Sequence, residues 1–176
     1  PRGGGLRAAT GDYRQCILDA VDWAGKHTPP YLLKSGKSIP FLASDLYNVW
    51  KINTGNPNPD KNFLATWLDV GPLYLIDMGV LDANSKMARY LMQAAEDRWM
   101  KGNVSNAEPY YMPQRGAYHG RDDVEGYLTM FYTLLAEGMD RQTYVTSESH
   151  HGVQNFPFND AEHSRTIRRM LVHENG

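Results

Sequence analysis

The sequence is poor in the features that mark several large classes of protein. Cys16 is the single cysteine among 176 residues, which excludes an internal disulfide framework but does not fix the cellular compartment. Lysines and arginines do not gather into runs, and the formal charge of −2 provides no basic field that would attract nucleic acid. Nucleic acid is therefore not expected as a partner.

Long hydrophobic runs are also missing. No apolar stretch reaches the roughly 18 residues that a membrane-spanning helix needs, and no charged-then-apolar signal segment opens the chain. We therefore expect a soluble protein without a membrane partner, in a compartment that the sequence leaves unknown. The chain opens with PRGGG and no methionine, which suggests processing, a tag remnant or a fragment of something longer.

The short motifs of several enzyme classes are absent as well. There is no G-x-S-x-G elbow, P-loop, G-x-G-x-x-G fingerprint or kinase motif set, so serine-based acyl transfer and nucleotide chemistry have no support. His150 and His151 are adjacent, but neighbouring side chains rarely converge on one ion, and neither H-E-x-x-H nor a cysteine-rich spacing accompanies them. We predict neither a metal site nor a cofactor.

Helical spacing, in contrast, fills most of the chain. Apolar residues recur at steps of three and four with almost no strand-like alternation, and a 41% hydrophobic content is enough for one sizeable core. We predict a single all-α domain over residues 1–176. The expected helices cover residues 12–27, 41–53, 62–80, 84–100 and 122–139, and a last helix that a capping box of Asn159 and Glu162 opens.

The first expected helix shows the pattern clearly. Thr28, Pro29 and Pro30 stop it, because proline cannot continue a helix. Its apolar residues follow the three- and four-residue steps of a helix: Tyr13, Ile17, Ala20, Val21 and Ala24. Cys16 lies on the same helix, where we expect it to be a small buried residue.

Two long polar loops, 101–121 and 140–159, flank the apolar helix at 122–139. Loops longer than about 12 residues without structure of their own are usually functional or disordered, and the aromatic content of these two argues against disorder. Acids, histidines, an arginine and tyrosines are concentrated in them. We therefore expect the functional site where these loops meet the helix.

Several acidic residues in these loops have neighbours suited to catalysis or binding. Glu148 stands among serines and histidines that could orient it and tune its protonation, and Glu108 precedes two tyrosines that could stack on a sugar ring. Asp122 and Asp123 are adjacent carboxylates that follow Arg121 directly.

Three stretches of the sequence carry a family resemblance. LATWLDVGPLYLIDMGVLD, EPYYMPQ and HGRDDVEGYLTMFYTLLAEGMDRQTYVTSESHH resemble the later helical hairpins of (α/α)6-toroid glycoside hydrolases and their uncharacterised relatives. The resemblance implies helices in two concentric rings, with sugar bound at the end where the loops gather. This chain provides about half of such a ring, so it implies a second chain or a missing segment that completes the toroid, or a fragment.

The residues and the resemblance together predict a carbohydrate-active protein, and most directly a glycoside hydrolase. That reaction needs one protonated and one ionised carboxyl group, and the candidates are Glu148, Asp123 and Glu108. The expected partner is an oligo- or polysaccharide. The residues expected to bind it are Tyr110, Tyr111, His119, Arg121, Asp122, His150, His151 and Trp67.

Other interpretations of these residues stay open. A polysaccharide lyase on a similar toroid would use Tyr118, His119 and Arg121, and a non-catalytic glycan-binding module would use the aromatic residues alone. Either Asp122 or Asp123 stands where a helix N-cap belongs. Glu108 and Glu148 also fit ordinary loop residues, and two residues of the helix at 62–80 have structural alternatives: Trp67 fits core packing and Asp69 fits a helix cap.

Overall fold

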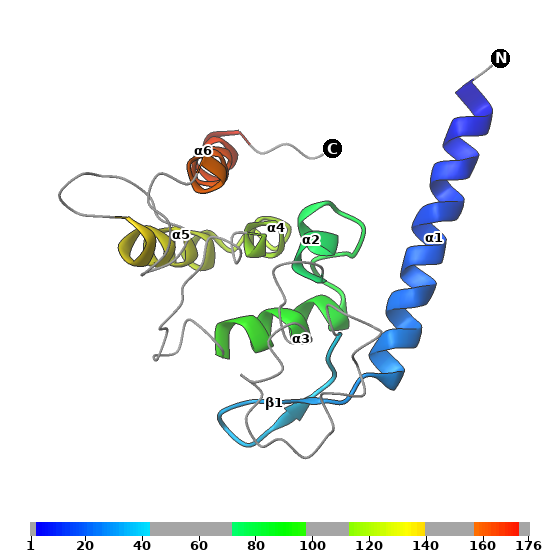
Figure 1. Ribbon diagram of the computed structural model, residues 1–176, viewed down its shortest axis with the longest axis horizontal. Coiled ribbons are helices and arrows are strands. Elements are labelled where there is room, and N and C mark those ends of the chain that lie inside the picture. Colours follow the sequence, from blue (N-terminus) through cyan, green and yellow to red (C-terminus); the bar gives the residue numbers. More distant parts are fainter. Residues whose placement is uncertain (1–2, 43–71, 98–112, 140–156, 173–176) are drawn as a thin grey trace.

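The structure is a computed structural model that describes residues 3–42, 72–97, 113–139 and 157–172, and these residues are mostly helical (Figure 1). The elements, in chain order, are α1 (Gly3–His27), β1 (Tyr31–Leu32), β2 (Ser38–Ile39), α2 (Pro72–Asp77), α3 (Lys86–Ala95), α4 (Gln114–His119), α5 (Val124–Gly138) and α6 (Pro157–Leu171). The predicted all-α class is confirmed. In the described ranges, the sheet is one antiparallel pair of two-residue strands.

Helix α1 ends at His27, before Thr28 and the two prolines, as predicted, but it begins earlier than predicted. The C-terminal part of the helix is packed against the body of the protein through Val21 and Ala24, while its N-terminal end projects past the other elements (Figure 1). The expectation that Cys16 is buried is wrong, because this cysteine lies on a different face of the helix from the buried Val21 and Ala24 and is exposed.

The short helices α2, α3 and α4 form the centre of the core. Leu73, Leu91 and Ala117, one from each helix, are fully buried. Helices α2 and α4 approach so closely that a Cβ atom added at Gly116 would lie 2.3 Å from the Cα atom of Asp77. Glycine at position 116 thus permits a backbone contact that any larger residue would prevent.

Helix α3 begins at a sequence signal that is easy to follow. The Ser85 hydroxyl accepts a hydrogen bond (3.2 Å) from the backbone N–H of Ala88, which is the usual role of an N-cap serine. The helix then buries Ala88, Leu91, Met92, Ala94 and Ala95 on the face toward the core. Its C-terminal end positions Glu96, which reaches the site described below.

Two further boundary predictions are wrong. The stretch 101–121 is not a continuous loop, because α4 occupies residues 114–119. The helix was not predicted because two of its buried side chains, Gln114 and Arg115, are polar and interrupt the apolar spacing that marks a helix. The last helix begins at Pro157, so Asn159 lies inside it, and Glu162 binds Arg115 instead of closing a capping box.

The predicted helix at 41–53 and residues 62–71 of the next one lie outside the described residues, apart from Phe41 and Leu42, which are buried in the core. None of the helices that the structure describes is long and apolar enough to cross a membrane.

Candidate functional site

A tight turn joins α4 to α5 and carries most of the predicted site residues that the structure describes. The backbone N–H of Asp122 donates to the carbonyl of His119 (3.1 Å), and the N–H of Asp123 donates to the carbonyl of Tyr118 (2.9 Å). The turn is thus closed by its own backbone, and its side chains are held in fixed directions.

The two adjacent acids have different roles in this turn. One carboxylate oxygen of Asp123 accepts the backbone N–H of Gly126 at 2.8 Å, so Asp123 is the N-cap of α5. Asp122 has a positive φ of 54° and is exposed, and within the described ranges no hydrogen bond or ion pair involves its carboxylate. A non-glycine residue at positive φ is a strained position of the kind that often marks a functional site.

Two side-chain hydrogen bonds connect the turn to the segment before α3. The Nε atom of Arg121 donates to the carbonyl of Ala83 at 2.8 Å, and the Asn84 side-chain amide donates to the carbonyl of Gly120 at 3.2 Å. Burial and the nearby Arg89 lower the pKa of Arg121. Arg121 therefore ties the turn to the segment before α3, and it is not among the residues that line the adjoining pocket.

Tyr118 is 3% exposed, and its hydroxyl group donates to a carboxylate oxygen of Glu96 at 3.1 Å. Burial and the negative charge of Glu96 raise the pKa of the phenol well above its ordinary value. Because its proton is committed to Glu96, Tyr118 remains a neutral donor and provides a wall of the pocket.

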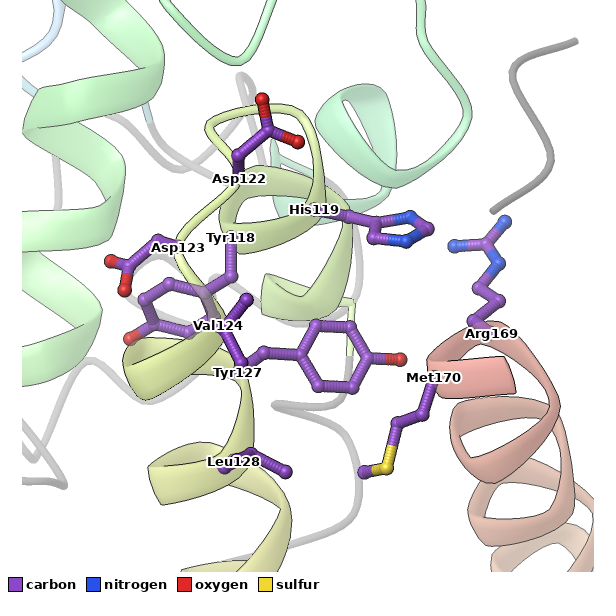
Figure 2. A pocket seen from close by; sticks show the side chains of 9 residues that line it. All are labelled: Tyr118, His119, Asp122, Asp123, Val124, Tyr127, Leu128, Arg169 and Met170. Atoms are coloured by element: carbon purple, nitrogen blue, oxygen red, sulfur yellow. The ribbon is translucent and has the colours of Figure 1, made fainter. Parts of the chain in front are cut away.

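A pocket of about 340 Å³ lies between this turn, the start of α5 and the end of α6 (Figure 2). Small-molecule sites in proteins span roughly 300–1,000 Å³, so the pocket has the size of a small ligand. The residues that line it are Tyr118, His119, Asp122, Asp123, Val124, Tyr127, Leu128, Arg169 and Met170.

The pocket combines aromatic, apolar and charged walls. Figure 2 shows the side chains of His119 and Arg169 pointing toward one another, with the Tyr127 ring between His119 and Met170. The ring centroids of His119 and Tyr127 are 5.8 Å apart, and the two ring planes are tilted by 54°. The Tyr127 hydroxyl donates to the carbonyl of Thr166 at 2.9 Å, which holds its ring in place against α6.

A buried ion cluster lies next to the pocket and shares Arg169 with it. The fully buried Arg115 contacts Asp77 through two nitrogens, at 3.3 and 3.1 Å, and contacts Glu162 at 2.5 Å. Arg165 lies 3.5 Å from Asp77 and 3.6 Å from Glu162, and Arg169 also binds Asp77. The cluster thus joins α2, α4 and α6.

The electrostatics of the cluster favour its ionised form. Burial alone would lower the pKa of Arg115, but the carboxylates of Asp77 and Glu162 more than offset this and raise the pKa above its ordinary value. Such a cluster resists disruption, because removing one partner leaves a buried charge uncompensated. Its role is to dock α6, and so to position Arg169 and Met170 at the pocket.

Sequence reasoning missed the ion cluster and the α6 wall of the pocket. Asp77 lies on a helix whose other residues are mostly apolar, and a buried acid has to be paired. This position therefore indicated that a basic residue would bind Asp77. Arg115 was assigned to a loop, and Arg169 is one of several arginines on an amphipathic helix. Neither shows in the sequence which acid it binds.

The structure brings together His119, Asp122 and Asp123 of the predicted site residues. Arg121 lies beside them but serves the turn. The other candidates lie outside the described residues, so their convergence on this pocket stays a prediction: Glu108, Tyr110, Tyr111, Glu148, His150, His151 and Trp67. In the part of the chain that is described, no three His, Cys, Asp or Glu side chains gather closely enough to hold a metal ion.

No protein-family model, curated protein or solved structure matches the chain. The function therefore has to be argued from the pocket itself.

Proposed function

We propose that the pocket between the α4–α5 turn and α6 binds a sugar unit of an oligo- or polysaccharide, and that the protein cleaves the glycosidic bond of that unit. The observation that carries the proposal is the presence of Asp122, His119 and the Tyr127 ring around one pocket of about 340 Å³. Sugars need both kinds of wall, because carboxylates and imidazoles bind hydroxyl groups while rings cover the apolar C–H face.

Asp122 is the acid on the turn best suited to act on the substrate. Asp123 already accepts the N–H of Gly126, so its carboxylate serves the helix, whereas Asp122 is exposed and lines the pocket. We assign Asp122 the role of one of the two carboxyl groups, and His119 that of a hydrogen-bond partner for a sugar hydroxyl.

Hydrolysis needs a second carboxyl group. One group protonates the leaving oxygen, and the other attacks the sugar carbon or activates a water molecule for that attack. Glu148 and Glu108 are the predicted candidates for this role. Separations of about 5–5.5 Å between the two carboxyl groups would suit retention of configuration, and about 6.5–9.5 Å would suit inversion.

The described geometry does not favour the lyase alternative. A lyase would need Tyr118 to take a proton from the substrate and Arg121 to neutralise a uronate. The Tyr118 hydroxyl, however, is buried against Glu96, and burial raises the pKa of this phenol. The Arg121 side chain binds the carbonyl of Ala83 instead of lining the pocket.

The test compares two acids that differ in position but not in charge. Asp122→Asn and Glu125→Gln each remove one carboxylate, and Glu125 is not among the residues that line the pocket. Saturation-transfer NMR with a panel of oligosaccharides identifies a ligand, and release of reducing ends measures cleavage.

We expect Glu125→Gln to match the wild type in both assays. Asp122→Asn should lower turnover by about 100-fold or more, which is the usual range for loss of an acid or base group, and Glu148→Gln or Glu108→Gln should do the same. If no glycan binds the full chain, or if Asp122→Asn and Glu125→Gln behave alike, the proposal is wrong.

A further inference from the structure

One exposed face of α1 carries regularly spaced residues, and the packing of the helix against the rest of the protein does not account for this regularity. The residues on this face are exposed and follow one another at steps of three and four, in a seven-residue repeat: Tyr13, Cys16, Ala20, Trp23 and His27. Tyr13 is 72% exposed and Trp23 is 57% exposed. This is the spacing of a helix that pairs with another helix.

A different face of α1 holds the helix on the body of the protein. Val21 and Ala24 are buried there, and a Cβ atom at Gly25 would lie 2.4 Å from the end of the Met87 side chain. Nearer the N-terminus, Arg14 donates to the carbonyl of Gly79 at 3.2 Å. The helix is thus fixed in place at the edge of the molecule (Figure 1), and the residues of its Tyr13–His27 face are exposed.

We propose that this face of α1 binds the same face of a second copy of the chain, with the two helices antiparallel. The pair would be isologous, and its two-fold axis would cross the helix at the level of Leu18, on the face opposite the core, so each contact occurs twice. Tyr13 would then lie beside the second copy's Trp23, and Cys16 beside the second copy's Ala20. Two small residues at the centre let the helices approach closely, and an aromatic pair closes each end.

The charges beside this face favour the antiparallel direction. Asp12 and Lys26 flank the two ends of the repeat and become neighbours across an antiparallel pair, which gives two attractive contacts. Lys26 keeps its bond to Asp22 (2.5 Å) within its own helix. One like-charge approach remains, between Asp19 and its own equivalent, and the Gln15 amide donates to that carboxylate at 2.8 Å.

A parallel pair would lack these advantages. The flanking acids Asp12 and Asp19 would face Ile17 and Ala24 of the second helix, so no opposite charges would meet. Trp23 would have to pack against its own equivalent, and so would His27, which stacks on Trp23 at 4.3 Å within one helix.

Sedimentation equilibrium over a wide range of protein concentration tests the pairing. The wild type should form a dimer, and Trp23→Glu or Tyr13→Glu should weaken dimerisation by about 30-fold or more, as expected when an aromatic anchor of an interface is replaced by a charge. Tyr132→Glu is the matched control, because Tyr132 is a 63% exposed tyrosine on α5. A wild-type chain that stays monomeric, or a dimer that survives Trp23→Glu, overturns the proposal.

Cysteine cross-linking tests the direction of the helices. In the antiparallel pair, Cys16 faces Ala20, so Ala20→Cys should form disulfide-linked dimers readily on mild oxidation. The wild type, whose two copies of Cys16 are offset by about 6 Å along the helix axis, should do so much more slowly. Equal cross-linking of the two proteins would point to a parallel pair and contradict the proposed arrangement.

Discussion

The ion cluster that docks α6 and the pocket beside it contain the same types of charged residue. The charges of the cluster are buried and paired, whereas the pocket has an exposed acid. In the cluster, Arg115, Asp77 and Glu162 each contact at least two charged partners and are almost completely buried. In the pocket, the carboxylate of Asp122 is exposed and has no described partner, and its backbone is held at a φ of 54°.

This difference separates residues that hold the fold from residues that are available to a ligand. A satisfied buried charge resists any change, because each partner compensates for the desolvation of the others. An exposed acid on a strained turn contributes little to folding, so its conformation calls for another explanation. Arg169 belongs to both regions, since it binds Asp77 and lines the pocket.

The largest effect should come from Arg115→Met. Methionine fills much of the space but leaves Glu162 and Asp77 short of a buried partner, so the free energy of unfolding should fall by about 3–5 kcal/mol. Urea unfolding followed by circular dichroism measures the change. Lys86→Met, on an exposed residue at the start of α3, should cost less than about 0.5 kcal/mol. Equal losses in both variants would mean that the cluster does not dock α6.

A second effect should separate two glycines. Gly116→Ala places a Cβ atom against the backbone of Asp77, where nothing can move aside cheaply, and should destabilise the fold by about 1–3 kcal/mol or more. Gly11→Ala, in an exposed part of α1 with nothing within 4 Å of the new atom, should stabilise the protein by about 0.5–1 kcal/mol. Thermal unfolding of the two variants should therefore move in opposite directions.

A third test sharpens the contrast between the two adjacent acids. Asp123→Ala removes the cap of α5 and should cost about 1 kcal/mol, while Asp123→Asn, which can still accept the Gly126 N–H, should cost less. Asp122→Gly relieves the positive φ and should leave stability unchanged or raise it by up to about 1 kcal/mol, yet abolish sugar binding. A clear loss of stability in Asp122→Gly would assign Asp122 to the fold instead.

The smallest effect concerns alkaline pH. The pKa of Tyr118 in the folded protein lies above the ordinary value of 10.0, so its contribution to stability is fully present below pH 10. Above that pH the unfolded chain loses a proton that the folded chain keeps, and stability falls as pH rises. Tyr118→Phe should make this decline shallower, whereas Tyr13→Phe, on an exposed tyrosine, should not. Unfolding midpoints at pH 9 to 11 test this.

Local signals in the sequence predicted the parts of the fold that depend on local chemistry. Thr28 and the two prolines after it end α1, as expected from their positions. The sequence placed the N-cap of α5 at Asp122 or Asp123, and the structure assigns it to Asp123. Helix α4 was missed because its buried positions hold the polar residues Gln114 and Arg115. Arg115 is suited to the core only because it binds Glu162, which lies far along the sequence.

The candidate site was predictable to the same extent. His119, Asp122 and Asp123 lie within a few residues of one another, so one turn was enough to gather them at one pocket. Arg169 and Met170 come from a helix far along the sequence, and their position at the pocket depends on the ion cluster that docks α6. Single-sequence patterns carry no information about which acid pairs with which arginine.

The central claim, that this pocket binds sugar, can be tested directly by NMR of methionine methyl groups labelled with ¹³C. Met170 lines the pocket, and Met78 is exposed elsewhere and provides an internal control. We predict that titration with an oligosaccharide that binds the protein shifts the Met170 signal and leaves Met78 unchanged, and that Asp122→Asn weakens this response. A bound sugar that leaves Met170 unmoved would contradict the claim.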